Sequence, residues 1–226
     1  MRSFLYSIFV SLLFLCMTCT AGCGTAARDT VSPETALKEL QLAIRERDAA
    51  KVASYVDLDR FLENTYDSSA RETALAVETL HERYPEDPFF WHDTKFMQQY
   101  AIDHRGISLQ FMKKILSHYF SKESPAASYD EDPESWLSGE LGKLHAAGTA
   151  EIREIRHTGP RHVSVFLQLK GDNTPYGKFT DGILLELGME QQEHGGWKVT
   201  GIENIPDLIL PVADKAEMFW TFQGWQ

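Results

Sequence analysis

The chain has 226 residues, of which 43% are hydrophobic and 12% aromatic, and its formal net charge is −11. This composition predicts a folded globular protein and argues against intrinsic disorder. No Lys/Arg-rich run offers the basic surface that phosphate binding needs, so we expect no nucleic-acid partner.

The first 22 residues have the pattern of a secretory signal peptide. Arg2 supplies a positive charge, and residues 4–17 form an uncharged apolar run. A membrane-spanning helix needs about 20 such residues, whereas a shorter run suits the hydrophobic region of a signal peptide. We therefore predict a signal peptide over residues 1–22.

All three cysteines, Cys16, Cys19 and Cys23, lie at this end of the chain. In the stretch Thr20-Ala21-Gly22-Cys23, two small residues precede a cysteine. The stretch resembles the lipobox of bacterial lipoproteins, with Thr20 at the position where Leu is usual. The resemblance implies cleavage before Cys23 and a diacylglycerol group on its thiol. The alternatives are an ordinary secreted protein cut nearby and an uncleaved anchor.

Cleavage before Cys23 would leave 204 residues with a net charge of −12, because Arg2 is the only charged residue removed. That chain could form no disulfide, so its core alone would stabilise it. Residues 23–31 would be the lipidated cysteine and a short polar tether. We expect an exported protein held by its lipid on the periplasmic or extracytoplasmic face of a bacterial membrane.

Residues 32–148 have helical patterns. Ser32 is a predicted N-cap with Pro33 in the first helical position, and Leu37, Leu40 and Ile44 follow at helical spacing. Further helix starts are predicted at Asp48, Asp57, Ser69, Asp87 and Asp132, with a helix break at Gly106.

Residues 149–204 alternate with a period of two, as in strands. Val163, Val165, Leu167 and Leu169 fall on one face. We predict strands over residues 151–157, 161–170, 178–190 and 197–202, joined by turns too short for helical crossovers. Helices followed by an antiparallel four-stranded meander make one α+β domain over residues 32–226, with the helices on the apolar face of the sheet.

Two segments resemble known families. Residues 36–63, with Ala43-Ile44, Asp48 and Tyr55-Val56-Asp57, are similar to the opening of bacterial envelope proteins with a DUF2939-type pattern. The meander ending in "GGWKVTGI" resembles the last strands of the nuclear transport factor 2-like superfamily, which has a cone-shaped α+β fold. The helical residues 68–148 exceed that fold, which implies an enlarged helical middle. The superfamily contains enzymes and non-catalytic binding modules, so the resemblance implies no activity.

Folds of this cone type bind ligands between the sheet and the helices. The resemblance therefore implies Phe166, Tyr176 and Trp197 as pocket-wall residues, although each also suits a plain core. No G-x-S-x-G, H-E-x-x-H, P-loop or G-x-G-x-x-G motif occurs, and we expect no cofactor.

His157 and His162 flank the four residues "TGPR". A four-residue hairpin loop would place the two imidazoles opposite each other, about 5 Å apart at Cβ. They are candidates for a metal or pH-sensitive pair, or for an exposed polar pair beside a turn.

The last segment, residues 205–226, is rich in large aromatic side chains: Phe219, Trp220, Phe222 and Trp225. Such side chains rarely stay in water, so this aromatic tail either packs back on the domain or docks on another envelope protein. We expect a non-catalytic, lipid-anchored envelope protein that acts as a binding or interaction module. The alternative is a small-ligand-binding protein or acid–base enzyme with a pocket between sheet and helices.

Overall fold

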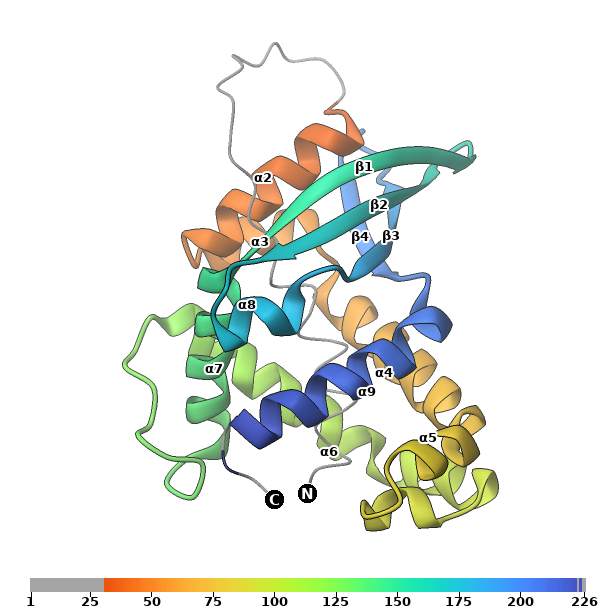
Figure 1. Cartoon of the computed structure of the whole chain (residues 1–226). Helices are drawn as coiled ribbons and strands as arrows, with labels where there is room; N and C mark the ends of the chain where they lie inside the picture. The colour runs from red at the N-terminus through yellow and green to blue at the C-terminus, as the bar shows by residue number, and fades with distance from the viewer. Residues whose placement is uncertain (1–30, 223, 225–226) are drawn as a thin grey trace.

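The computed structural model of the protein describes residues 31–222 and residue 224. Helices come first in the chain and the sheet follows, which confirms the α+β class (Figure 1). The helical part consists of α2 (Pro33–Arg45), α3 (Ala49–Tyr55), α4 (Leu58–Leu75), α5 (Val77–Arg83), the 3-10 helix η2 (Pro88–Trp91), α6 (Thr94–Ser121) and α7 (Pro133–Ala147). The remainder consists of β1 (Gly148–Gly159), β2 (His162–Gly171), α8 (Pro175–Thr180), β3 (Leu184–Gln191), β4 (Trp197–Ile202) and α9 (Ile205–Phe222).

Short polar side chains cap most helix starts. Ser32 accepts from the Thr35 amide at the start of α2, and Asp132 accepts from the Ser135 amide at the start of α7. The predicted starts at Asp48, Asp57 and Asp87 are capped in the same way. Each cap satisfies a backbone N–H that the helix itself leaves unpaired, which contributes about 1 kcal/mol.

Two predicted helix boundaries are wrong. The helix α4 runs through Ser69, whose side chain is buried, and α6 continues through Gly106 for a total of 28 residues. A single glycine inside a helix costs about 1 kcal/mol, which the packing of the residues after it outweighs. Leu109, Met112 and Ile115 supply that packing.

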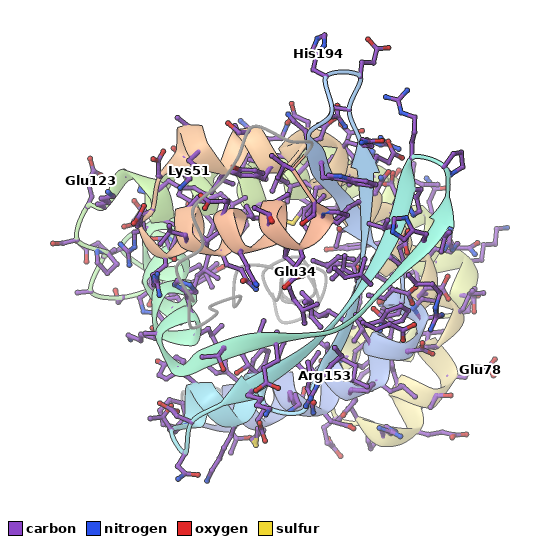
Figure 2. The ribbon with its side chains drawn as sticks, turned by 90° about the horizontal axis from the view of Figure 1, so that it is seen from above. Glu34, Lys51, Glu78, Glu123, Arg153 and His194 are labelled. Carbon is purple, nitrogen blue, oxygen red and sulfur yellow. The ribbon has the colours of Figure 1, made fainter. Side chains whose placement is uncertain are left out.

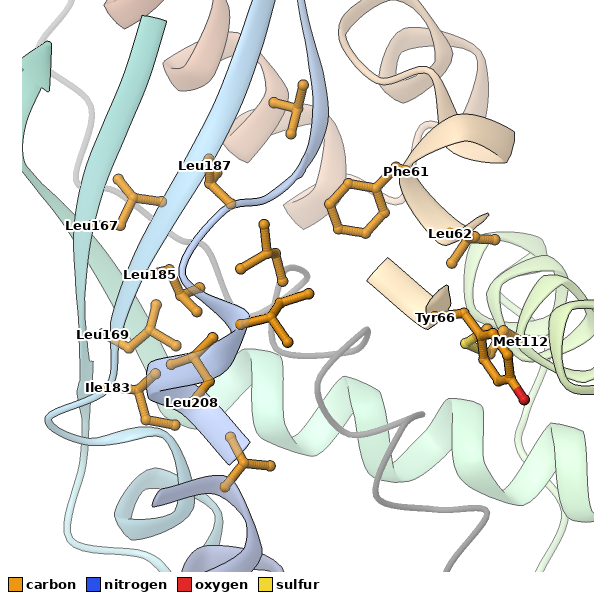
Figure 3. Close-up of a cluster of buried hydrophobic side chains, with 14 of the residues drawn as sticks. Phe61, Leu62, Tyr66, Met112, Leu167, Leu169, Ile183, Leu185, Leu187 and Leu208 are labelled. Atoms are coloured by element: carbon orange, nitrogen blue, oxygen red, sulfur yellow. The ribbon is translucent and has the colours of Figure 1, made fainter. Parts of the chain in front are cut away.

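The strands form one antiparallel sheet in the order β1-β2-β3-β4, which confirms the predicted meander. Its inner face is aliphatic, and side chains of α4 and α9 pack against it, as Figure 3 shows for Phe61 and Leu208. The fully buried residues of that face are Val163, Val165, Leu167, Leu169, Leu185, Leu187, Met189 and Val199. An isolated parallel bridge between Val56 and Val199 adds to the β4 edge.

The sequence patterns missed two helices. The segment after β2 was predicted as a turn leading into a strand from residue 178, but it forms α8, with Thr174 as its cap, and β3 begins only at Leu184. The segment predicted as an aromatic tail is mostly α9, whose apolar stripe, including Ile205, Val212 and Phe219, is buried in the domain.

The sheet and the start of α2 lie at one end of the molecule, and α5 with the start of α6 lies at the other (Figure 1). The helix α4 connects the two ends, because it begins beside β4 and ends beside α5. Its 18 residues correspond to about 27 Å.

Candidate functional site

The predicted lipidation site, Cys23, and the signal peptide of residues 1–22 lie outside the described residues. Within the part of the chain that the structure describes, no helix is both long enough and apolar enough to cross a membrane.

The three predicted ligand-binding residues lie on different parts of the fold. Phe166 is on the outer face of the sheet, since its neighbours in β2 point inward, and the Arg156 guanidinium lies 4.6 Å from its ring centroid. Trp197 pairs with Gln191 near the start of β2, whereas Tyr176 follows the end of β2. The structure does not bring the three residues together, and ligand binding by any one of them stays a prediction.

The predicted histidine pair is also wrong in its geometry. His157 is opposite Val163 and Gly159 is opposite His162, because the hairpin turn is shorter than four residues. Val163 and His162 are neighbours in a strand and point to opposite faces, so the two imidazoles do not face each other. Among the described residues, no group of three His, Cys, Asp or Glu side chains could hold a metal ion.

His162 instead belongs to a small polar cluster on the outer face of the sheet. Its Nε2 is 2.7 Å from Glu203 Oε1, and the Ser164 hydroxyl donates to Glu203 Oε2 at 2.5 Å. A nucleophilic serine needs its histidine between the hydroxyl and the carboxylate. Here the carboxylate lies between the other two groups, so this arrangement does not activate Ser164.

The aromatic residues of α9 pack back on the domain where the structure describes them. The Phe219 ring is 5.6 Å from Tyr176 and 5.8 Å from Phe179, and it is buried. Phe222 touches Tyr176 but remains half exposed. The Trp220 side chain and all of Trp225 lie outside the described part, so docking through this segment stays a prediction.

A row of stacked rings along the start of α6 was not predicted. Phe96, Tyr100 and His104 follow one another at intervals of four residues, which places them one above the next on α6. His92 lies just before the helix, and its ring stacks on that of Phe96. The centroids of successive rings are 3.8 Å, 6.1 Å and 3.9 Å apart, and every pair is nearly parallel. We call these four residues the aromatic stripe. The spacing of four in the sequence was a signal that could have revealed it.

Large apolar groups at this end of the molecule are exposed and held in place. Trp91, next to the stripe, is 62% exposed, yet its indole Nε1 donates to the Pro85 carbonyl at 2.7 Å. Phe96 is 43% exposed. The rings of Phe89 and Tyr100 make an edge-to-face contact, with their centroids 5.5 Å apart. Exposed apolar patches with a fixed shape are typical of interaction sites.

A second unpredicted feature is a buried polar pair between α6 and α7. The Nδ1 of His145 is 2.9 Å from the Tyr119 hydroxyl, and its Nε2 is buried without a hydrogen-bond partner. Burial, together with the positive charges of Arg47 and Arg45, lowers the pKa of His145 to about 4. The imidazole is therefore neutral at physiological pH.

Two open grooves lie elsewhere on the surface. One, of about 730 Å³, lies at the two hairpin turns and includes Arg161, His162, Glu190 and His194. The other, of about 280 Å³, lies between α4 and α6 beside Tyr66. Neither contains the aromatic stripe or His145.

No protein-family model matches the chain, and no curated protein or solved structure is significantly similar to it.

Proposed function

We propose that this protein is a lipid-anchored, non-catalytic component of a bacterial envelope, and that it acts as an interaction module through the aromatic stripe and Trp91. The observation that carries the interaction role is the ordered row of partly exposed rings on α6. Tryptophan, tyrosine and phenylalanine are enriched at protein interfaces, and rings that already pack against one another lose less entropy on binding than isolated ones.

The position of the stripe fits an anchored protein. The tether of residues 23–31 would span at most about 30 Å and would join the domain at α2, beside the sheet. Figure 1 has α5 and the start of α6 at the opposite end of the molecule. An anchor at Cys23 would therefore join the domain at the end opposite the stripe, which leaves the stripe accessible to other envelope proteins.

Metabolic labelling with radioactive palmitate tests the anchor. Full-length protein expressed in a bacterium should be labelled and should fractionate with membranes, and Cys23→Ser should lose both properties. Cys19→Ser is the matched control, because it removes a nearby thiol that would leave with the signal peptide. Retention of label and membrane association by Cys23→Ser would show that the anchor is wrong.

The buried imidazole of His145 favours a second candidate, a small-ligand-binding protein or acid–base enzyme. A neutral histidine with an unpaired Nε2 is suited to accept or donate one hydrogen bond to a bound molecule. Native mass spectrometry of the purified protein distinguishes the candidates. A bound small molecule that His145→Gln loses would support the second candidate, and a bare protein mass would support the first.

A further inference from the structure

We propose that the aromatic stripe, with Trp91, is a docking surface for a protein segment rich in arginine and lysine. A guanidinium group would stack on Trp91, and the methylene stems of neighbouring cationic side chains would lie along the exposed ring edges of the stripe. The surrounding carboxylates would pair with the positive charges. This inference rests on the proposed interaction role and specifies the chemistry of the partner.

The surroundings of the stripe are acidic. Residues 78–105 contain six acidic and three basic side chains. Two of the three cations are already paired, Arg83 with Asp214 and Arg105 with Asp67. The exposed carboxylates of this stretch are those of Glu78, Glu82, Glu86, Asp93 and Asp103. The local negative charge adds to that of a strongly acidic chain, so it attracts cationic partners over several ångströms.

Trp91 can form the aromatic half of a cation–π contact. The face of an aromatic ring is negative and attracts a cation within about 6 Å of its centroid. One such contact forms within the protein, where the Arg47 guanidinium lies 4.7 Å from the centroid of the Tyr119 ring. Among the described residues, none of the cation–π contacts involves Trp91 or the stripe. The faces of Phe96 and Tyr100 lie against their stacked neighbours, so these rings offer a partner their exposed edges. Trp91 is 62% exposed and is not one of the stacked rings, so it is the ring that remains available to a partner's cation.

The same charges disfavour other occupants. Acidic residues around the rings repel anionic lipid headgroups and nucleic-acid phosphates. A second copy of this chain would bring two acidic surfaces together, which like-charge repulsion opposes. A basic segment of a partner protein is the occupant that satisfies both the rings and the carboxylates.

Fluorescence anisotropy with labelled nona-arginine as the probe tests the proposal on the full chain purified in detergent. The double variant Trp91→Ala/Phe96→Ala should weaken binding about tenfold or more at 0.15 M salt, because it removes the stacking surface without changing charge. Leu184→Ala is the matched control, since Leu184 is 59% exposed on β3. It should change binding by less than about twofold.

Two further double variants distinguish the effect of charge near the stripe from the effect of the overall net charge. Glu82→Gln/Glu86→Gln and Glu123→Gln/Glu131→Gln remove the same charge, near the stripe and far from it. Figure 2 shows Glu78 of α5 and Glu123 on opposite sides of the molecule. The first pair should weaken binding more than the second, and nona-arginine should bind more tightly than nona-lysine, because only guanidinium groups stack well on rings.

Each alternative outcome overturns the proposal. Equal binding by wild type and Trp91→Ala/Phe96→Ala would mean that the rings take no part. Loss of self-association or of binding to phosphatidylglycerol vesicles in that variant, without loss of peptide binding, would identify a second copy or a membrane as the occupant. Palmitate labelling of Cys23 depends on none of these results, so failure of the docking inference is distinct from failure of the anchor.

Discussion

The two halves of α6 differ in how much of their apolar surface is buried. The second half packs into the core with Leu109, Met112, Ile115, Leu116 and Tyr119, whereas Met97 is the only apolar side chain of the first half that is fully buried among the described residues. The first half nevertheless carries Phe96 and Tyr100 in an ordered stack. Aromatic side chains that do not stabilise a core but keep a fixed arrangement indicate a surface for contact. Four predictions test this difference.

The largest effect is expected in the second half. Ile115→Ala should lower the free energy of unfolding by about 2–5 kcal/mol, because Ile115 is completely buried and truncation leaves a cavity. Ile102→Ala, in the first half of the same helix, is the matched control, since Ile102 is 68% exposed. Urea denaturation measures both. Similar losses of unfolding free energy in the two variants would show that the two halves of α6 contribute equally to the core.

Acid should destabilise the region around Tyr119. His145 has a folded-state pKa of about 4 against 6.5 when unfolded, so the unfolded chain binds the additional proton first. The contribution of His145 to stability should be constant above pH 6.5 and should fall by about 1.4 kcal/mol per pH unit between pH 6.5 and 4. Urea midpoints measured across this pH range should depend less on pH in His145→Gln than in the wild type. Exposed His194→Gln should leave the slope unchanged, and an unchanged slope in His145→Gln would contradict the shift.

A smaller effect is expected at the start of α6. Asp93 accepts a hydrogen bond from the Phe96 amide at 2.7 Å and so caps the helix. Asp93→Ala should lower the free energy of unfolding by about 1 kcal/mol, and Asp93→Ser should restore most of it. Thermal unfolding followed by circular dichroism compares the two. Equal melting temperatures for wild type and Asp93→Ala would show that the cap contributes nothing.

The smallest effect is expected for the stripe itself. Phe96→Ala should change the free energy of unfolding by no more than about 1 kcal/mol, because it loses one stacked neighbour on each side but little buried area. Phe90→Ala, at a buried phenylalanine of η2, should cost about 3–5 kcal/mol. A loss for Phe96→Ala as large as that for Phe90→Ala would make the stripe a structural element.

Local patterns predicted much of the fold. Alternating Val and Leu residues predicted the strands, and short connections allowed only antiparallel pairing, so the meander followed. The caps at Ser32 and Asp132 predicted helix starts, because a side chain that bonds a nearby amide acts within one turn. The boundaries predicted at Ser69 and Gly106 were wrong, because the local preferences of these residues are weaker than the tertiary packing around them.

The sequence by itself determined the α+β class, the helical first half, the antiparallel meander after it, and the features that predict an N-terminal lipid at Cys23, because these depend on residues close together in the chain. The tertiary structure alone decided which aromatic residues became core and which stayed exposed. Phe219 became buried because α8 supplies Tyr176 and Phe179 as neighbours, whereas Phe96 stayed exposed because no element covers that side of α6 within the described residues. Burial depends on contacts between segments far apart in sequence, which periodicity does not encode.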